Sequence, residues 1–572
     1  MDRSGPRPAA GGDSLSKLEG RVLGHIVSFL PAKEAARAAL LSSRWRDVYA
    51  GAHTVCLEEP ESPIKERDYR CSSPGYCTPP DPNRPPPFAS TVSAALLARN
   101  HRGGAAPLRA LRVAKEQFCK TESSTVDQWV SYAVQQAAPE GLDLDLRLWC
   151  RRLSCNRPYS LLRGGQQADN EDASASVTAT GPFGFDQVAD MAEATPEPDS
   201  DQVADTENDQ YSSDDSIVSS DDGKEDARFS RRVPWWQEGP ALYTISRVVF
   251  CAALRSLSLS TCQLNLPPTV VLPSLETLLL SNVSDPGSDV QRLISSCPRL
   301  ADLTLEACDT VTTLSVLGGA RLRRLALRCC HELATVTVDT SELQAFDYRG
   351  AVPDSTFLIT HGGSGRIADC KVDICGREVS SEEKLIKLWQ LLQLFVNVRH
   401  LHLESARLGS GFDKDVAMRF PVFSSLRHLE LRGMLPDDDT AAVAAVSRLL
   451  EHAPNLEVLS LIFHPLDYER DSRIMKEEEL LDAHHLSYNP YSVLAVPSVV
   501  IPCLRSGVKE INLVHYQGGR AQRTLAKFLL CNAPVIDELW CDFAGGPLQI
   551  HTELMREIKG WVINKSANTH FS

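Results

Sequence analysis

A six-residue pattern with apolar residues at its first, fourth and sixth positions recurs along most of this chain of 572 residues. Successive patterns from Leu254 begin 21, 25, 22 and 21 residues apart, within the range of roughly 20–29 residues for leucine-rich repeats. The pattern therefore predicts a solenoid to which each unit adds one short strand. It begins at Leu108, Leu254, Leu275, Leu300, Leu322, Leu343, Val398, Leu426, Leu456 and Val508.

Side chains alternate along a strand, so each unit should bury its last two apolar residues and expose the residues between them. Cysteine stands at the turn position of three units, Cys262, Cys308 and Cys330, and we interpret these thiols as structural. Segments 289–300 and 446–456 have helical spacing. We therefore expect units of strand plus helix, an α/β solenoid of horseshoe form.

Residues 14–50 have the pattern of short helices. Apolar residues recur at helical spacing from Leu18 to Leu30, Pro31 ends this helix, and a second, Ala-rich helix should end near Trp45. Helices this short cannot bury so wide an apolar surface by themselves. The surface either packs on the rest of the chain or docks another protein.

Three segments lack the apolar residues of a packed core. Residues 1–13 read as a disordered tail, residues 60–90 as a Pro-rich linker or loop, and residues 164–232 as a disordered acidic insert. Repeat-like units should occupy residues 91–163 and 233–470.

The acidic insert carries most of the net charge. Between residues 186 and 226 there are fifteen acidic residues and one lysine, a net of −14, whereas the whole chain has −15. The folded part should therefore be nearly neutral. Ser212 and Ser219 each have an acidic residue three positions later, the arrangement that acid-directed kinases prefer, and are candidate phosphorylation sites.

Several function classes find no support in the sequence. It has no run of about 18 apolar residues, as a membrane span requires, and no N-terminal secretory signal. We therefore expect a cytoplasmic or nuclear location with reduced cysteines. We also expect no cofactor, and no metal because no Cys-x-x-Cys pair occurs. The motif Gly-Asp-Ser-Leu at residues 12–15 follows no strand, so Ser14 is interpreted as a helix cap and the chain as non-catalytic.

Residues 15–48 resemble a plant F-box. Segments 273–285, 293–309 and 508–539 resemble the plant F-box/LRR/FBD class, and residues 471–572 resemble its FBD region with final repeats. Glu19 stands where the family usually has proline. The best F-box matches are Leu18, Ile26, Phe29, Leu30, Pro31, Ala36, Arg37, Leu41, Arg44 and Trp45.

This resemblance implies a substrate-recognition subunit of a Skp–cullin–F-box-type ubiquitin ligase, whose chemistry resides in other subunits. It implies that the F-box binds a Skp-type adaptor, and a cullin through it. The alternative is a repeat scaffold or regulator that joins no ligase. The predicted adaptor-binding residues are Leu18, Val22, Ile26, Phe29, Leu30, Pro31, Leu41 and Trp45.

The exposed strand positions of a solenoid form its binding face. Their polar, mixed-sign character favours an unknown protein substrate over nucleic acid. The acidic insert could cover the cationic members of this face and compete with substrate. The predicted substrate-binding residues are Asp302, Glu306, Arg324, Arg328, Asp347, Arg349, His400, His402, Glu404, His428, Glu430 and Arg432.

Overall fold

The computed structural model describes residues 18–59 without 31 and 39–42, 87–100, 106–148 without 116, 117 and 119, then 155, 157, 159–161, 242–245, 251–317, 321–362, 366–465, 485–496 and 498–572. The chain divides into two units, residues 1–168 with 242–572, and residues 169–241. The second unit lies outside the described residues, as do the predicted tail 1–13, the acidic insert 164–232 with Ser212 and Ser219, and residues 60–86 of the predicted linker.

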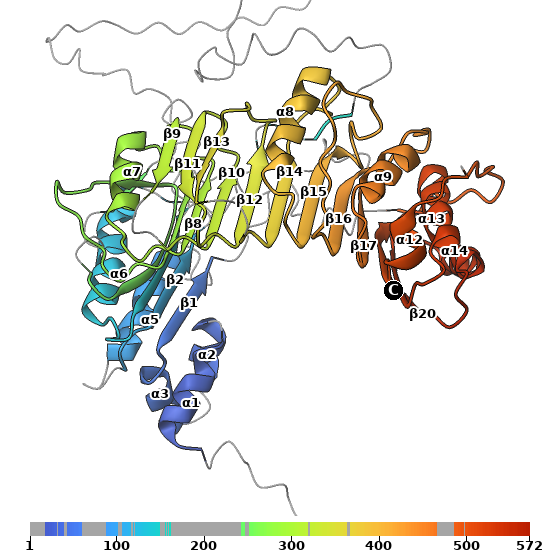
Figure 1. Cartoon of the computed structure of the whole chain (residues 1–572). Coiled ribbons are helices and arrows are strands. Elements are labelled where there is room, and N and C mark those ends of the chain that lie inside the picture. The colour runs from blue at the N-terminus through green and yellow to red at the C-terminus, as the bar shows by residue number, and fades with distance from the viewer. Residues whose placement is uncertain are drawn as a thin grey trace, which may run out of the picture. The chain divides into compact units, whose positions relative to one another are not determined.

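One parallel sheet of fifteen described strands dominates the first unit (Figure 1). The strands follow chain order, so each repeat pairs with the next. They are β1 (Thr54–Glu58), β2 (Ala110–Ala114), β3 (Leu142–Arg147), β5 (Leu254–Ser260), β7 (Thr277–Ser281), β8 (Asp302–Glu306), β10 (Arg324–Arg328), β12 (Ala345–Gly350), β14 (Asp369–Ile374), β15 (His400–Arg407), β16 (His428–Met434), β17 (Val458–His464), β18 (Glu510–Tyr516), β19 (Glu538–Phe543) and β20 (Asn568–Phe571).

The predicted inward positions form the core. In β8, Leu303 and Leu305 are fully buried while Thr304 between them is half-buried on the other face. Neighbouring strands pair leucine with leucine, as Leu303 does with Leu278 and Leu325. The apolar side chains therefore stack into a continuous core, and the mixed α/β fold with its long parallel sheet is that of a leucine-rich-repeat solenoid.

The turn cysteines lie where the pattern places them. Cys262 and Cys308 are fully buried, and their thiols contact strand-end carbonyls such as Glu306 O, 3.5 Å from Cys308 Sγ. The residue before each turn cysteine, including Thr261 and Ala307, has a positive φ. The chain thus turns sharply at each strand end, and only a small side chain fits beneath the turn.

Helices connect most of the strands. In chain order they are α5 (Phe88–Asn100), a 3-10 turn (Lys120–Glu122), α6 (Ser123–Gln135), α7 (Gly287–Ser295), α8 (Glu382–Gln393), α9 (Ala442–Glu451), α12 (Pro502–Ser506), α13 (Arg520–Asn532) and α14 (Leu548–Trp561). Their buried residues pack on the inward side chains of the sheet, as the stacking of Phe346 of β12 on Phe395 after α8 shows. No helix of the described part is long and apolar enough to cross a membrane.

The expectation of a helix in each unit is wrong for three central repeats. Their connections instead form a second parallel sheet of β9 (Thr313–Val316), β11 (Thr335–Asp339) and β13 (Leu358–His361). A further pair joins β4 (Tyr243–Ile245) to β6 (Cys262–Leu264). Units of 21 or 22 residues are shorter than the 25-residue unit that holds α7, and β-branched stretches such as Thr335–Asp339 favour strands.

Five of the fifteen sheet strands, β1, β3, β14, β19 and β20, lie outside the ten repeats of the pattern, and in β14 and β19 the reason is a cysteine in place of an inward leucine. In β14, Cys370 and Val372 point inward and are buried, and in β19 the inward pair is Leu539 and Cys541. Cysteine behaves as a small apolar residue in a core. A pattern that accepts cysteine at the inward positions would have found both strands.

Three helices precede the sheet: α1 (Gly20–Val27), α2 (Ala32–Ala38) and α3 (Ser43–Ala50). The prediction of one second helix that ends near Trp45 is wrong, since α3 begins at Ser43 and continues to Ala50; serine favours helix starts. The helices enclose a small core of their own, made of Leu23, Val27, Ala35, Val48, Tyr49 and Ala52.

We predict that Leu303→Ala lowers the free energy of unfolding by about 2–5 kcal/mol, because it leaves a cavity between stacked repeats. Thr304→Ala is the matched control on the outward face of the same strand and should change stability by less than about 0.5 kcal/mol. Urea unfolding followed by circular dichroism measures both. Equal losses would show that the two faces do not differ as described.

Candidate protein-binding surfaces

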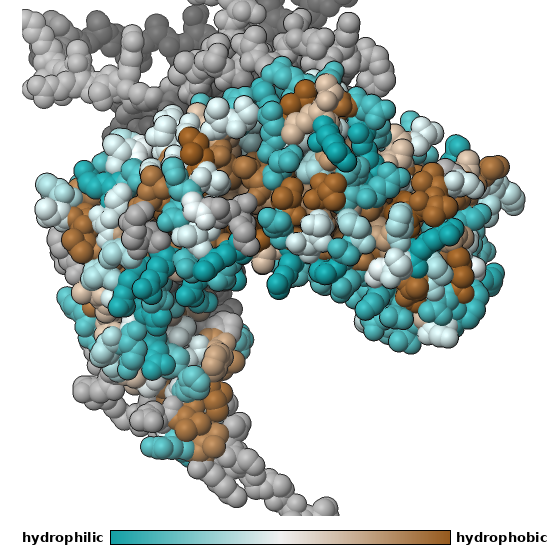
Figure 2. All heavy atoms as spheres, in the orientation of Figure 1, coloured by the Kyte–Doolittle hydropathy of each residue, from teal (hydrophilic) through white to brown (hydrophobic). Residues whose placement is uncertain are grey.

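The N-terminal helices leave a cluster of large apolar side chains in solvent. Val22 and Ile26 of α1 and Phe29 and Leu30 after it are all exposed, and Phe29 is 75% exposed. Figure 2 shows hydrophobic side chains gathered over these helices. Exposed contiguous apolar residues on a soluble domain mark a protein contact site, and we call these four residues the N-terminal apolar patch.

The predicted adaptor-binding residues thus fall into three groups. Val22, Ile26, Phe29 and Leu30 form the patch. Leu18 and Trp45 are partly buried and pack against the helical core, where Arg44 donates a hydrogen bond to the Leu18 carbonyl. Pro31 and Leu41 lie outside the described residues.

The outward residues of β8 to β16 form rows across the sheet, because these strands are parallel and pair in register at the positions concerned. One row runs Glu306, Arg328, Arg349, Asp373, Glu404, Arg432. The next runs Thr304, Ala326, Asp347, Lys371, His402, Glu430. A third runs Asp302, Arg324, Ala345, Asp369, His400, His428. The structure therefore brings all twelve predicted substrate-binding residues onto one face.

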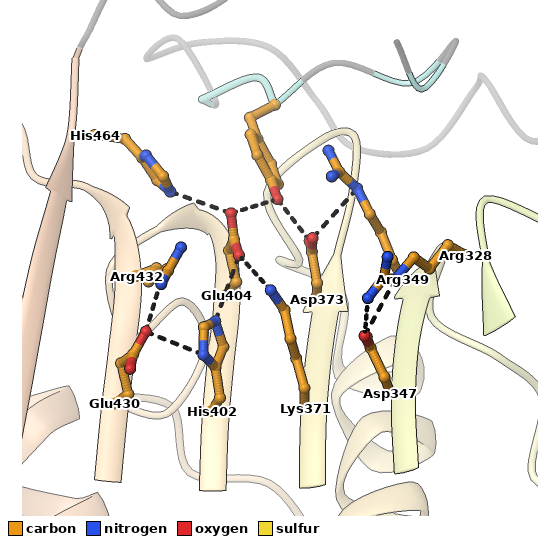
Figure 3. A network of polar contacts seen from close by, with 11 residues as sticks. Arg328, Asp347, Arg349, Lys371, Asp373, His402, Glu404, Glu430, Arg432 and His464 are labelled. Carbon is orange, nitrogen blue, oxygen red and sulfur yellow. Dashed lines mark hydrogen bonds and ion pairs between the residues drawn. The ribbon is translucent and has the colours of Figure 1, made fainter. Parts of the chain in front are cut away.

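Most charges on this face are paired within it. Arg328 Nη2 lies 2.5 Å from Asp347 Oδ2, and Arg349 Nε lies 3.2 Å from Asp373 Oδ2 (Figure 3). Arg324 and Asp302, both exposed, are 4.0 Å apart. These cations are therefore compensated by carboxylates of neighbouring strands.

Opposite charges are also paired on the strands toward the C-terminus, both within and between strands. Arg432 Nε lies 2.6 Å from Glu430 Oε1, which also lies 3.0 Å from His402 Nδ1 (Figure 3). His400 Nδ1 lies 2.5 Å from Asp369 Oδ1, and the His400 ring packs edge-to-face on His428. The face is polar and of mixed sign, and it is not a basic groove.

A short segment far away in the sequence lies on this face. Tyr159 is 2% exposed, and its hydroxyl is 2.6 Å from Asp373 Oδ1 and 3.0 Å from Glu404 Oε1. Its ring stacks on His464 at the end of β17. Ser160 pairs with the backbone after β14, since Ser160 N donates to Gly376 O. We call Cys155, Arg157 and residues 159–161 the strap.

The strap buries part of the predicted binding face. Asp373 is 1% exposed and Glu404 is 5% exposed, although both occupy outward strand positions. Glu404 Oε1 also lies 3.2 Å from His464 Nε2, and Glu404 Oε2 lies 3.5 Å from His402 Nε2 and 3.7 Å from Lys371 Nζ. The prediction that Glu404 is an exposed binding residue is therefore wrong, because Tyr159 covers it.

Burial and these contacts set the protonation states of Asp373 and Glu404, the two carboxyl groups beneath Tyr159. Burial, followed by the charge of Glu404, raises the pKa of Asp373 to about 7. Burial also acts on Glu404, but hydrogen bonds from His402 and His464 outweigh it and hold the pKa of Glu404 well below its usual range. Because the Tyr159 hydroxyl has one proton, we infer that protonated Asp373 donates to Tyr159 and that Tyr159 donates to ionised Glu404.

The pKa values of His402 and Glu430 are shifted in opposite directions. Burial opposes the charged form of His402, but hydrogen bonds to Glu404 and Glu430 outweigh it and raise the pKa of His402. Burial likewise opposes ionisation of Glu430, but its hydrogen bond with His402 dominates and lowers the pKa of Glu430 to about 2. A protonated His402 between two carboxylates is therefore favoured.

Sequence reasoning missed Tyr159, Lys371, Asp373 and His464. Lys371 and Asp373 belong to the strand that the leucine pattern did not find, and the alternation rule places both outward once β14 is recognised. His464 lies at the end of a recognised strand. Tyr159 had no signal in the sequence, because its partners Asp373 and Glu404 are 214 and 245 residues away.

We predict that the free energy of unfolding falls as the pH rises from roughly 5 to 7.5. The folded-state pKa of Asp373, about 7, lies above its unfolded value of 3.8, so its stabilising contribution is complete below 3.8 and is lost as the pH approaches 7. Asp373→Asn mimics the protonated carboxyl and should flatten this pH dependence. Urea unfolding of both proteins across the range measures it, and an unchanged slope in the variant would contradict the role of Asp373.

Comparison with known proteins shows which proteins this chain resembles. Residues 247–492 match the family model described as At1g61320/AtMIF1, LRR domain. The chain is 23% identical over 330 residues to the probable FBD-associated F-box protein At1g32375 of Arabidopsis thaliana, a match that covers 56% of this chain and 67% of the relative.

Two further Arabidopsis thaliana relatives give similar matches. The FBD-associated F-box protein At5g38590 is 28% identical over 50% of this chain and 62% of its own length. The F-box/LRR-repeat protein At5g35995 is 27% identical over 36% of this chain and 46% of its own length. The chain thus spans about two thirds or less of the relatives it matches. The predicted resemblance is confirmed: this chain is similar to plant F-box/LRR-repeat and FBD-associated F-box proteins, and its residues 247–492 match a leucine-rich-repeat domain model.

Proposed function

We propose that this protein is the substrate-recognition subunit of a Skp–cullin–F-box-type ubiquitin ligase of the cytoplasm or nucleus. The N-terminal helices bind a Skp-type adaptor, and a cullin through it. The outward face of the repeat sheet binds a protein substrate. The chain itself contributes no catalysis, and the ligase chemistry belongs to the other subunits.

The N-terminal apolar patch is the observation that carries this proposal. Its four side chains stay exposed even though the helices have a core of their own and the sheet lies next to them. Burying an exposed side chain of this size is worth about 1.5–3 kcal/mol. The relatives are named F-box proteins, and a patch on short N-terminal helices supports adaptor binding by this chain.

The helices are attached to the repeats by a buried arginine. The fully buried Arg99 of α5 donates from Nε and Nη2 to Ala52 O, at 2.9 and 2.6 Å, and from Nη2 to Ala106 O at 2.7 Å. These charge-assisted hydrogen bonds join the end of the helical module to the first repeats. Such an attachment would hold a bound adaptor at a fixed place on the repeat sheet.

The outward face supports a protein substrate. Its charges are of both signs and are already paired, across strands as in Arg328–Asp347 and His402–Glu430 or within one strand as in Arg432–Glu430. A partner that competes for these pairs must offer charges of both signs in a matching order, as a folded protein or structured peptide does. A nucleic acid offers one sign only.

The second candidate function is a repeat scaffold or regulator that does not assemble a ligase. The observation that favours it is Glu19, which stands where F-box sequences usually have proline and which directly precedes α1. In this alternative the apolar patch contacts another protein.

We predict that Phe29→Asp weakens binding of a purified Skp-type adaptor by at least about tenfold, because it buries a carboxylate in an apolar contact. The exposure of Phe29 means that the fold should tolerate the substitution. Val271→Asp is the matched control, since Val271 is 67% exposed on the repeats. Isothermal titration calorimetry measures the affinities.

Two outcomes would contradict the ligase proposal. One is an adaptor that does not bind the wild-type chain, which leaves the scaffold alternative. The other is equal affinity for wild type and Phe29→Asp, which moves adaptor binding away from the patch. Affinity purification with and without the first 60 residues, read by mass spectrometry, then separates adaptor-dependent partners from partners of the repeat face.

A further inference from the structure

Four side chains with a thiol or an imidazole lie at the edge of the sheet where strands β10, β12 and β14 end, and the strap supplies one of them. Cys329 and His331 follow β10, and Cys375 follows β14. Parallel strands all end at the same edge, so these residues lie close together although the sequence separates them. Cys155 of the strap, which is 176 residues from His331, completes the group.

The ligand atoms of these residues converge. The Cys155 and Cys329 sulfurs and a His331 ring nitrogen all lie within 4.8 Å of one another. Cys155 Sγ is 3.4 Å from His331 Nε2. The Cys375 thiol interacts with the thiols of both Cys155 and Cys329. Three ligand atoms, from Cys155, Cys329 and His331, are therefore mutually close, and the Cys375 sulfur adjoins the two other sulfurs.

These separations suit one tetrahedral zinc ion. Zinc binds sulfur at about 2.3 Å and histidine nitrogen at about 2.0–2.1 Å, which puts two thiolates about 3.8 Å apart and a thiolate and a histidine nitrogen about 3.6 Å apart. The observed 3.4 Å between Cys155 Sγ and His331 Nε2 is close to the second value. Three cysteines and one histidine form a common ligand set of closed structural zinc sites.

The surroundings of the cluster also suit thiolate ligands. Cys329 and Cys375 are buried, and Cys155 and His331 are half-buried, so the site is shielded but reachable from solvent. The backbone N–H of Arg157 donates to the Cys155 sulfur. Hydrogen bonds of this kind orient thiolates and stabilise their charge in metal sites. None of the described cysteines is in a disulfide.

We propose that Cys155, Cys329, His331 and Cys375 bind one zinc ion, which fixes the strap to the sheet. Binding converts the three thiols to thiolates, and their protons pass to solvent. No redox partner is needed. The ion and the Tyr159 contacts then hold the strap at two points, one beyond β10 and one over Asp373 and Glu404. If the proposed substrate face is correct, zinc also determines that this part of the face stays covered.

The neighbouring Cys330 does not belong to the site. Its sulfur lies 3.5 Å from Arg328 O, in the turn position that the repeat pattern assigns to it. Adjacent cysteines thus have different roles, one in the turn and one in the zinc site. The short spacing that identifies most zinc sites in a sequence is absent from this group, because the tertiary fold brings the ligands together from three distant segments.

Zinc content of the purified full-length chain tests the proposal. We expect about one zinc per chain by inductively coupled plasma mass spectrometry, and a thiolate-to-cobalt charge-transfer band when cobalt replaces zinc. Cys155→Ser and His331→Ala should each weaken zinc binding by at least about a hundredfold in competition with a chromophoric chelator, since even outer-shell changes cost 10–100-fold. Both residues are half-buried, which favours correct folding of the variants, and circular dichroism verifies it.

Cys531→Ser is the matched control, because Cys531 is exposed and lies on α13, away from the cluster. It should keep the zinc and the cobalt band. Three results would overturn the proposal: wild type purified with reductant and zinc present contains none, the Cys155 and His331 variants bind zinc as tightly as wild type, or alkylation and peptide mapping show Cys155 and Cys329 joined in a disulfide. Each is independent of whether the chain binds an adaptor.

Discussion

The fold of this protein depends on the burial of two apolar side chains per strand by the next strand in the stack. A single unit such as β8 has no face against which Leu303 and Leu305 could be buried, and it gains one only from β7 and β10. Stability is therefore a property of neighbours, as in other repeat arrays. The register that stacks the leucines also fixes the outward residues in rows, so the core and the polar face have one cause.

This register has an electrostatic consequence. In a parallel sheet, outward residues of adjacent strands lie side by side, and like charges there would repel. The rows place Asp347 beside Lys371 and Glu430 beside His402. Arg328 and Arg349 do lie side by side, but each pairs with a carboxylate of the next strand, Asp347 and Asp373. Because the pairs stabilise each other across strands, the face is nearly neutral, and a partner gains affinity only by matching or replacing existing pairs. A uniformly charged partner would be repelled as often as attracted.

The strap shows how such a face can be partly closed by the chain that carries it. Tyr159 supplies one hydroxyl to two buried carboxylates, Asp373 and Glu404, and burial keeps a proton on the pair near neutral pH. This arrangement is sensitive to pH, whereas the N-terminal apolar patch depends on burial of apolar surface and is not. The two candidate surfaces therefore respond to different conditions, although Arg99 and its carbonyl partners join the helices to the repeats.

The sequence by itself determined the repeat architecture, the strand positions with leucine at the inward sites, the turn cysteines and the alternation that selects the outward residues. These features are local, because side-chain alternation and repeat length need no distant partner. Where the local signal was altered, by cysteine in β14 and β19 or by short units with β-branched residues, prediction failed. Only the tertiary structure decided which residues lie under Tyr159 and that Cys155 meets Cys329, His331 and Cys375. Those contacts join segments up to 245 residues apart, and no periodicity connects them.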